Sequence, residues 1–526
     1  MTGTRIATLD STLRDGAQGA GVAFSVEDKL AIVRALDSFG VDYIEAGNPA
    51  SNPKDAAFFE RAHSLALSRA KLCAFGSTRK KDTAVEEDRG VRALAAAGTS
   101  VVALFGKAWD MQVERVLETT AGENLRMIAE TVAYFKSLSK EVIFDAEHFF
   151  DGFRANPEYA LSCLRAAEQA GADVVCLCDT NGGALPEEIH AGTARAAQVL
   201  SCPVGVHCHN DAGLAVAGTL AAVRAGASHV QGTFIGIGER CGNANLSTVI
   251  ANLQLKYGYG CVPAENLQRL RQTARIIAER TNVRLSPGMP YIGSAAFAHK
   301  GGMHIDGVEK CAESFEHVDP ELVGNTRKLL TSEMAGRSTL VNKIRVFAPE
   351  LGKDSQEIER IVARLKQLEF EGYQFEAAES SFELIVRKML GRYHPFFELD
   401  HYRILGENGR DGSRNTGALI KVKVGDKAEI TAAEGNGPVH ALDSALRKAL
   451  TVFYPSLRKV RLTDYKVRVM EPKDGTATTV RVLIESTDGE RIWTTVGVSA
   501  DIIEASWIAL CDSIEYKLTL DEERER

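Results

Sequence analysis

The first 270 residues repeat one pattern eight times: a short apolar run followed by a longer stretch with helical periodicity. Strands that alternate with helices pair in parallel, and eight such units have the usual length of a closed barrel. An open, doubly wound sheet is the structural alternative, but eight evenly spaced units favour closure. We therefore predict a TIM barrel, (β/α)8 in class, with strands at 5–10, 41–46, 71–77, 100–106, 141–148, 173–180, 203–209 and 229–236.

The ends of several helices are also marked in the sequence. Ser25, followed three residues later by Asp28, is typical of a helix N-cap with acidic residues in the first turn. Glycines stand after four helical stretches and shortly before the next strand, where a helix C-cap is expected: Gly40, Gly98, Gly171 and Gly226.

With 526 residues the chain is too long for one domain. Residues 271–405 are helical and loop-rich, so we predict linker subdomains there. Residues 406–526 are expected to form a C-terminal α+β domain. Its first part, the polar, glycine-rich stretch 406–417, is predicted to be a linker that leads into the folded module. Two strand–loop–helix passages at 428–450 and 492–516 resemble each other and indicate an internal duplication.

The composition limits the kinds of partner that we expect the protein to bind. The net charge of −8 and the lack of a basic stripe argue against nucleic acid. No run of about 18 apolar residues and no signal peptide is seen, so we expect no membrane association. Ten scattered cysteines fit a reduced, cytoplasmic protein. The expected partners are small molecules.

A metal site is indicated by His207 and His209, which close the seventh predicted strand. Side chains at i and i+2 share a face of a strand, so the two imidazoles project together and Cys208 projects the other way. In a closed barrel, the seventh, eighth and first strands are neighbours. Asp15 after the first strand and Asn243 after the eighth are therefore predicted to complete the ligand set of Zn, Mn, Co or Mg.

Chemistry-bearing residues gather at the carboxyl ends of the other predicted strands, where barrel enzymes place their active sites. Arg14 suits a developing oxyanion, or a salt bridge to Glu45 or Glu147. Glu147 is the best-placed carboxylate for proton transfer, and His304 is the other candidate base. The same face also carries Gln18, Asp145 and Thr180.

Three motifs in this order resemble the acyl-CoA/2-oxo acid condensing enzymes, which include the 2-isopropylmalate, homocitrate and citramalate synthases. They are Leu9-Asp-Ser-Thr-Leu-Arg-Asp-Gly-Ala-Gln18, Val206-His-Cys-His-Asn-Asp-Ala-Gly-Leu-Ala215 and Gly238-Glu-Arg-Cys-Gly-Asn-Ala244. Further matches, such as Asp145-Ala-Glu-His-Phe-Phe-Asp-Gly152 and Cys178-Asp-Thr-Asn-Gly-Gly183, are most similar to the long bacterial citramalate synthases. The resemblance covers nearly the whole chain.

The resemblance implies a Claisen-type condensation of acetyl-CoA, the co-substrate, with pyruvate to give citramalate and CoA. It implies that Asp15, His207, His209 and Asn243 hold the metal. The 2-oxo acid would be bound by Arg14, Gln18, Asp145 and Thr180, and Glu147 with His304 would remove a methyl proton. It also implies a homodimer in which the His304 segment reaches the partner's site. The C-terminal domain would then be regulatory and bind an end-product amino acid, isoleucine or leucine.

Two positions depart from the relatives: Asn48 stands where a tryptophan is expected, and Phe315 where many carry a tyrosine. The alternatives are a 2-isopropylmalate synthase or another synthase with a different 2-oxo acid, a lyase, a metal-dependent hydrolase, and a non-catalytic amino-acid sensor. The intact ligand set argues against the sensor.

Overall fold

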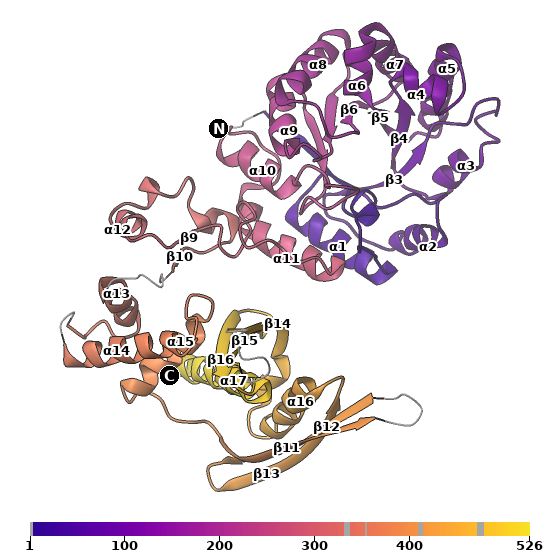
Figure 1. Ribbon diagram of the computed structural model, residues 1–526. Coiled ribbons are helices and arrows are strands. Elements are labelled where there is room, and N and C mark those ends of the chain that lie inside the picture. Colours follow the sequence, from indigo (N-terminus) through magenta and orange to yellow (C-terminus); the bar gives the residue numbers. More distant parts are fainter. Residues whose placement is uncertain (1–3, 331–336, 353–354, 409–413, 471–477, 526) are drawn as a thin grey trace. The chain divides into compact units, whose positions relative to one another are not determined.

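The computed structural model describes residues 4–330, 337–352, 355–408, 414–470 and 478–525. The chain forms two compact units (Figure 1). The first consists of Met1–Ala298 and Gly307–Lys328, and the second of His299–Asp306 and Leu329–Arg526.

Eight parallel strands close into a barrel in the order of the sequence, with β1 paired to β8. This confirms the TIM barrel and excludes the open, doubly wound sheet. The strands are β1 (Ala7–Asp10), β2 (Tyr43–Glu45), β3 (Lys71–Ser77), β4 (Val101–Lys107), β5 (Glu141–Glu147), β6 (Val174–Asp179), β7 (Val204–Cys208) and β8 (His229–Gly232). The last strand is shorter than predicted because a turn begins at Thr233, whose carbonyl accepts from the Gly236 backbone N–H.

Helices surround the barrel, and Figure 1 shows them in indigo to magenta as an outer ring. A 3-10 turn, η1 (Gly16–Gln18), follows β1. The helices are α1 (Val26–Phe39), α2 (Pro53–Ala62), α3 (Arg89–Ala96), α4 (Asp110–Arg115), α5 (Ala121–Ser137), α6 (Phe149–Ala155), α7 (Pro157–Gln169), α8 (Pro186–Val199), α9 (Ala215–Arg224) and α10 (Leu246–Leu255).

The predicted helix ends are confirmed. The Ser25 hydroxyl accepts from the Asp28 backbone N–H while the Asp28 carboxylate accepts from the Ser25 backbone N–H, which is a capping box at the start of α1. Gly40 ends the same helix at φ +102°, a left-handed conformation that a side chain would strain. The three other predicted cap glycines also have positive φ: Gly98, Gly171 and Gly226.

Alternation along the strands decides what reaches the mouth of the barrel. Val101, Ala103, Ile143 and Cys176 are fully buried in a cluster that includes residues of several strands. Because every second residue points to the same side, the residues further along these strands continue inward at the carboxyl end. The inward face therefore continues, at its polar end, with Phe105 and Lys107 on β4, Asp145 and Glu147 on β5, and Cys178 on β6.

The remainder of the first unit is helical. Its elements are η2 (Ala264–Arg269), α11 (Leu270–Thr281), η3 (Ala312–Ser314) and η4 (Pro320–Val323). Three short elements stand where the chain passes between the two units: β9 (Ala298–His299), α12 (Gly302–Lys310) and β10 (Lys328–Leu329). None of the helices in the described part of the chain is long and apolar enough to cross a membrane.

The second unit begins with three helices around a small apolar core: α13 (Arg337–Phe347), α14 (Gln356–Phe370) and α15 (Glu379–Met389). The predicted linker at 406–417 is wrong. Its described residues belong to the antiparallel strands β11 (Glu398–Asn408) and β12 (Arg414–Val424), and 409–413 lie outside the described residues. The polar, glycine-rich composition did not indicate these paired strands, because the backbone hydrogen bonds between strands do not depend on side-chain polarity.

The rest of the second unit repeats one arrangement. Strands β11, β12 and β13 (Lys427–Gly435) form a sheet followed by α16 (Pro438–Leu450). After η5 (Pro455–Lys459), strands β14 (Arg461–Val469), β15 (Val480–Thr487) and β16 (Ile492–Ser499) form a second sheet, followed by α17 (Ile502–Glu525). Both predicted strand–loop–helix passages are present. The Thr431 hydroxyl donates to the Ala445 carbonyl, and the Thr495 hydroxyl to the Ala509 carbonyl, at matching places in the two halves.

Candidate active site

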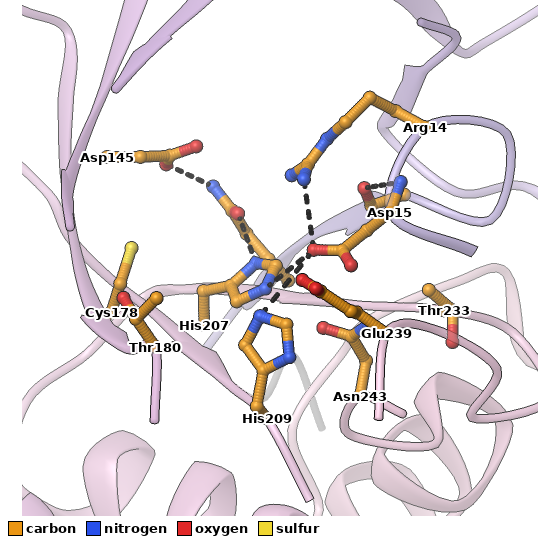
Figure 2. A network of polar contacts seen from close by, with 12 residues as sticks. Arg14, Asp15, Asp145, Cys178, Thr180, His207, His209, Thr233, Glu239 and Asn243 are labelled. Carbon is orange, nitrogen blue, oxygen red and sulfur yellow. Dashed lines mark hydrogen bonds and ion pairs between the residues drawn. The ribbon is translucent and has the colours of Figure 1, made fainter. Parts of the chain in front are cut away.

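Three buried residues at the carboxyl end of the barrel have potential ligand atoms that all lie within 4.8 Å of one another: Asp15, His207 and His209. Asp15 lies beyond the end of β1, His207 is the next-to-last residue of β7, and His209 directly follows that strand. The Nε2 atoms of His207 and His209 lie 3.3 Å and 3.7 Å from the same carboxylate oxygen, Oδ2 of Asp15 (Figure 2). The Cys208 thiol lies on the opposite side of the strand, against Gly218 of α9. The i, i+2 alternation thus holds as expected.

The Asp15 carboxylate is stabilised as an anion. Burial alone would raise its pKa, but the Arg14 guanidinium and the two imidazoles lower it well below the usual range. Arg14 donates to Asp15 Oδ2 over 3.0 Å, while Oδ1 is buried and has no hydrogen-bond partner among the described residues. An ionised carboxylate with one oxygen left unpaired is well suited to binding a cation.

His207 is held in one tautomer by a relay across the barrel interior. The Gln231 side-chain N–H donates to Asp145 Oδ1 over 2.9 Å. This bond directs the side-chain oxygen of Gln231 at His207 Nδ1, and these two atoms are 2.9 Å apart. Because that oxygen only accepts, Nδ1 carries a proton, and Nε2 is the ring nitrogen that faces Asp15. Burial would lower the pKa of His207, but the hydrogen bond and charge of the Asp15 carboxylate raise it. Burial, with a further contribution from the Glu45 charge, raises the pKa of Asp145 to about 6.

His209 is disposed to stay neutral. Burial lowers the pKa of His209 to about 4, and the neighbouring His207 contributes, because two positively charged imidazoles side by side would repel each other. A neutral imidazole is the form that binds metal ions.

Asn243 joins this group through the loop after β8. The backbone of Asn243 pairs with that of His209 in an isolated antiparallel bridge, and the Ala244 backbone N–H donates to the Cys208 carbonyl. The Asn243 side-chain oxygen is buried with no hydrogen-bond partner among the described residues. Gly238 lies so close that a Cβ atom there would be 2.2 Å from Asn243 Nδ2. The loop therefore presents an uncommitted amide oxygen beside the histidines (Figure 2).

These four residues fit a divalent cation. Two imidazole nitrogens, one carboxylate and one amide oxygen converge, and the oxygens of Asp15 and Asn243 that lack partners are the groups that a cation would satisfy. The set contains no thiolate, which suits Zn, Mn, Co or Mg.

Arg14 is fixed by its own set of contacts. Its Nε donates to Glu45 Oε2 over 2.6 Å, and its guanidinium carbon lies 3.8 Å from the centre of the Phe75 ring. The Ser11 hydroxyl donates to the same Glu45 oxygen. Burial would lower the pKa of Arg14, but the Glu45 and Asp15 carboxylates raise it, so the cation persists. Of the two salt-bridge partners that the sequence left open, Glu45 is the one observed.

Glu147 lies at the end of β5 with a different partner. Its Oε2 is 2.6 Å from the Lys107 ammonium at the end of β4. The two residues are direct neighbours in the register of the strands. Directly after the next strand, β6, the Thr180 hydroxyl accepts from the His148 backbone N–H over 2.8 Å. The ends of β4, β5 and β6 thus place an ammonium, a carboxylate and a hydroxyl around the mouth.

The remaining predicted residues lie in simpler surroundings. Gln18 is exposed at the end of η1. His304 is exposed on α12, in the stretch that belongs to the second unit, so its role stays a prediction. Asn48 makes a turn, in which its side-chain oxygen accepts from the Ala50 backbone N–H. Phe315 packs against Gly307.

Sequence reasoning missed Gln231, Lys107 and Arg240. Gln231 and Lys107 could have been found from the strand alternation, because each lies at an inward position near the end of its strand. Arg240 carried no such signal. It donates to Asp211 after β7 over 2.8 Å and to the Thr180 carbonyl after β6 over 2.8 Å, and thus joins three loops at the mouth.

Three family models match the chain in succession. The model described as HMGL-like covers residues 5–277, the homocitrate synthase post-HMGL domain-like model covers 291–372, and the LeuA allosteric (dimerisation) domain covers 376–518.

Curated relatives span the full length. The (R)-citramalate synthase of Aquifex aeolicus is 53% identical over 99% of this chain and 99% of its own. That of Synechocystis is 47% identical over 98% of this chain and 97% of its own. The 2-isopropylmalate synthase of Methanocaldococcus jannaschii is 31% identical over 97% of this chain and 94% of its own.

Proposed function

Because this chain belongs to the HMGL-like family, and within it to the (R)-citramalate synthases along its whole length, we propose that it condenses acetyl-CoA with pyruvate. The products are citramalate and free CoA. The reaction is that of an acyl-CoA/2-oxo acid condensing acyltransferase and uses one water molecule to release the thiol.

The observation that carries this proposal is the convergence of Asp15, His207 and His209 beside Arg14 at the mouth of the barrel. A ketone becomes an electrophile only if the charge that forms on its oxygen is stabilised. The guanidinium of Arg14 is fixed by Glu45 and Phe75, so it does not have to reorganise when that charge appears.

We propose that Asp15, His207, His209 and Asn243 hold a divalent cation. When bound, the cation would act as a Lewis acid on the 2-oxo acid. The relay from Asp145 through Gln231 keeps His207 in the tautomer that such a ligand needs.

Arg14 is assigned to the carbonyl of the 2-oxo acid, and Thr180 and Gln18 to its polar groups. The Thr180 hydroxyl accepts one backbone hydrogen bond and therefore has its own proton left to donate to a carboxylate. The sequence assigned Asp145 to the substrate as well. Its bond to Gln231 favours an indirect contribution through His207.

Glu147 is assigned to proton abstraction, with His304 assisting. The Glu147 carboxylate takes a proton from the acetyl-CoA methyl group, and the electron pair of that C–H bond makes the methylene carbon nucleophilic. The methylene carbon then bonds to the keto carbon of pyruvate. Water cleaves the thioester of the product and releases citramalate and CoA.

The match to a LeuA-type dimerisation domain over residues 376–518 supports a dimer and regulation from the second unit. We propose a homodimer in which His304 serves the partner's barrel. We further propose that an amino acid, isoleucine for a citramalate route, binds to the repeated α+β module.

The test is a thiol-release assay with acetyl-CoA and a panel of 2-oxo acids: pyruvate, 2-oxobutyrate, 2-oxoisovalerate and 2-oxoglutarate. We expect pyruvate to give the highest kcat/KM, and Asp15→Asn to lose activity on every acceptor. A preference for 2-oxoisovalerate would instead assign a 2-isopropylmalate synthase. Thiol release at the same rate without any oxo acid would point to a hydrolase and overturn the proposal.

A further inference from the structure

The ammonium of Lys107 has no assigned role in the proposed condensation, although it contacts the proposed base. Its nitrogen lies 2.6 Å from Glu147 Oε2, and both side chains are mostly shielded from solvent, with 14% and 23% of their surface exposed. The parallel register sets Lys107 directly beside Glu147 on the adjacent strand. Both residues are the last of their strands, on the face that leads into the mouth.

A simple structural ion pair is a poor explanation for this position. Removing two charges from water is costly, and an ion pair that stays partly exposed recovers little of that cost. The barrel also contains a more exposed pair at its other end, where Lys71 Nζ, on a side chain that is 52% exposed, lies 2.6 Å from Glu141 Oε2 at the starts of β3 and β5. The pair at the mouth differs because its carboxylate is the group assigned to chemistry.

Proton abstraction from a thioester moves one negative charge. Before the step, the charge is on the Glu147 carboxylate. When the methyl proton moves to that carboxylate, the C–H electron pair forms a carbon–carbon double bond and the carbonyl electrons move to the thioester oxygen. The charge is then on that oxygen, two bonds from the carbon that lost the proton.

A cation that lies next to the base is also within reach of that oxygen. If the ammonium of Lys107 pairs first with the carboxylate and then with the enolate oxygen, neither charge is left unpaired in a partly desolvated site. Lys107 keeps its protons throughout, so atoms and charge balance. Lysine suits this task because its ammonium is a compact point charge on a flexible chain with three donors.

We propose, on the basis of the proposed function, that Lys107 is a further catalytic residue that stabilises the enolate oxygen of acetyl-CoA. It acts on the acetyl donor, whereas Arg14 acts on the oxo acid. The assignment makes two demands that a merely structural residue would not meet: a loss in kcat rather than in KM, and a specific affinity for an anion at the position of the enolate oxygen.

The kinetic test compares Lys107→Met with Lys71→Met, which removes the ammonium of the Lys–Glu pair at the far end of the barrel. We expect Lys107→Met to lower kcat by about 100-fold to 1,000-fold, with KM for acetyl-CoA changed less than threefold. Lys107→Arg should restore part of the loss. Lys71→Met should stay within threefold of the unchanged enzyme.

The binding test separates action on the enolate from positioning of Glu147. Glu147→Gln imitates the protonated base. S-carboxymethyl-CoA carries a carboxylate on the carbon that corresponds to the thioester carbonyl carbon, and thus places a negative charge close to the position of the enolate oxygen. We expect Glu147→Gln to bind S-carboxymethyl-CoA at least tenfold more tightly than S-ethyl-CoA. Adding Lys107→Met to that variant should abolish the difference.

Two results would overturn the assignment: a Lys107→Met enzyme with more than a third of the normal kcat, or a double variant that still prefers the anionic analogue. In either case the unchanged enzyme would still convert pyruvate, and the proposed function would stand. If the unchanged enzyme releases no thiol with any 2-oxo acid, the proposed function fails and the role of Lys107 fails with it.

Discussion

The relay from Asp145 through Gln231 to His207 allows the sharpest test of the metal site, because Gln231 is not itself assigned as a ligand. Gln231 is fully buried and makes one hydrogen bond of 2.9 Å to each neighbour. Gln231→Leu conserves much of the side-chain volume and removes both bonds. His207 is then free to adopt the other tautomer, in which Nε2 carries the proton and faces Asp15.

Gln231→Leu should affect both metal affinity and stability, because two groups lose a partner. Loss of a partner that orients a metal-binding histidine weakens metal affinity by about 10-fold to 100-fold. Leaving the Asp145 carboxylate without its donor should also cost about 1 to 3 kcal/mol of stability. Since the pKa of Asp145 is already raised to about 6 by burial, the stability loss should be greater at pH 8, where this carboxylate is ionised, than at pH 5.

The assay is calorimetric titration of the metal-free protein with Mn²⁺, together with thermal unfolding at the two pH values. Gln254→Leu is the matched control, because Gln254 accepts from the Val262 backbone N–H over 3.0 Å at α10 and is not part of the relay. Unchanged Mn²⁺ affinity in Gln231→Leu, or an equal loss in Gln254→Leu, would refute the idea that the tautomer of His207 is controlled by Gln231.

Two further predictions concern buried positions near the barrel axis and the last loop. His229 is buried without a hydrogen-bond partner for either ring nitrogen among the described residues, and burial lowers its pKa to about 4, below the 6.5 of an exposed histidine. The unfolded chain therefore takes up the extra proton as the pH falls from 6.5 towards 4. When the pH falls from 7 to 5, the free energy of unfolding of the unchanged protein should therefore drop by about 2 kcal/mol more than that of His229→Leu, as measured by denaturant titration. Equal drops in the two proteins would contradict this prediction. For Gly238→Ala, the new Cβ would meet Asn243 Nδ2 at 2.2 Å, so kcat should fall at least tenfold while the unfolding midpoint moves by only a few degrees; full activity would show that the loop position of Asn243 is unimportant.

The part of the site that the sequence predicts best depends only on strand order. Once eight units close into a barrel, the end of β1 and the end of β7 must lie at one mouth, separated by β8 alone, and the i, i+2 rule directs both histidines inward. The convergence of Asp15 with His207 and His209 needs no further information.

The partners of the charged groups could not be predicted in the same way, because they depend on register. A shift of one residue between β4 and β5 would separate Lys107 from Glu147 and turn one of them outward. The sequence left Arg14 with two acceptable carboxylates, and only the observed register selects Glu45. The pairing of β11 with β12 was missed for a related reason. Glycine-rich polar sequence has little strand propensity, and this pairing is set by the sheet to which both strands belong.

Besides Asp15, the carboxylates of Glu45, Asp145 and Glu147 lie at the mouth, and their surroundings suit them to different tasks. Glu45 has no exposed surface and accepts from both Ser11 and Arg14, so its charge is committed and a substrate proton cannot reach it. Asp145 is buried and directs its oxygen at Gln231. Glu147 keeps 23% of its side chain exposed, and the contact observed for it is with Lys107, an ion pair that can yield when the carboxylate becomes neutral. In active sites with several carboxylates, the environment of each one decides whether it is held fixed or is able to transfer a proton. By this criterion we propose Glu147 as the base, Glu45 as the group that fixes the Arg14 cation, and Asp145 as a residue that acts through His207.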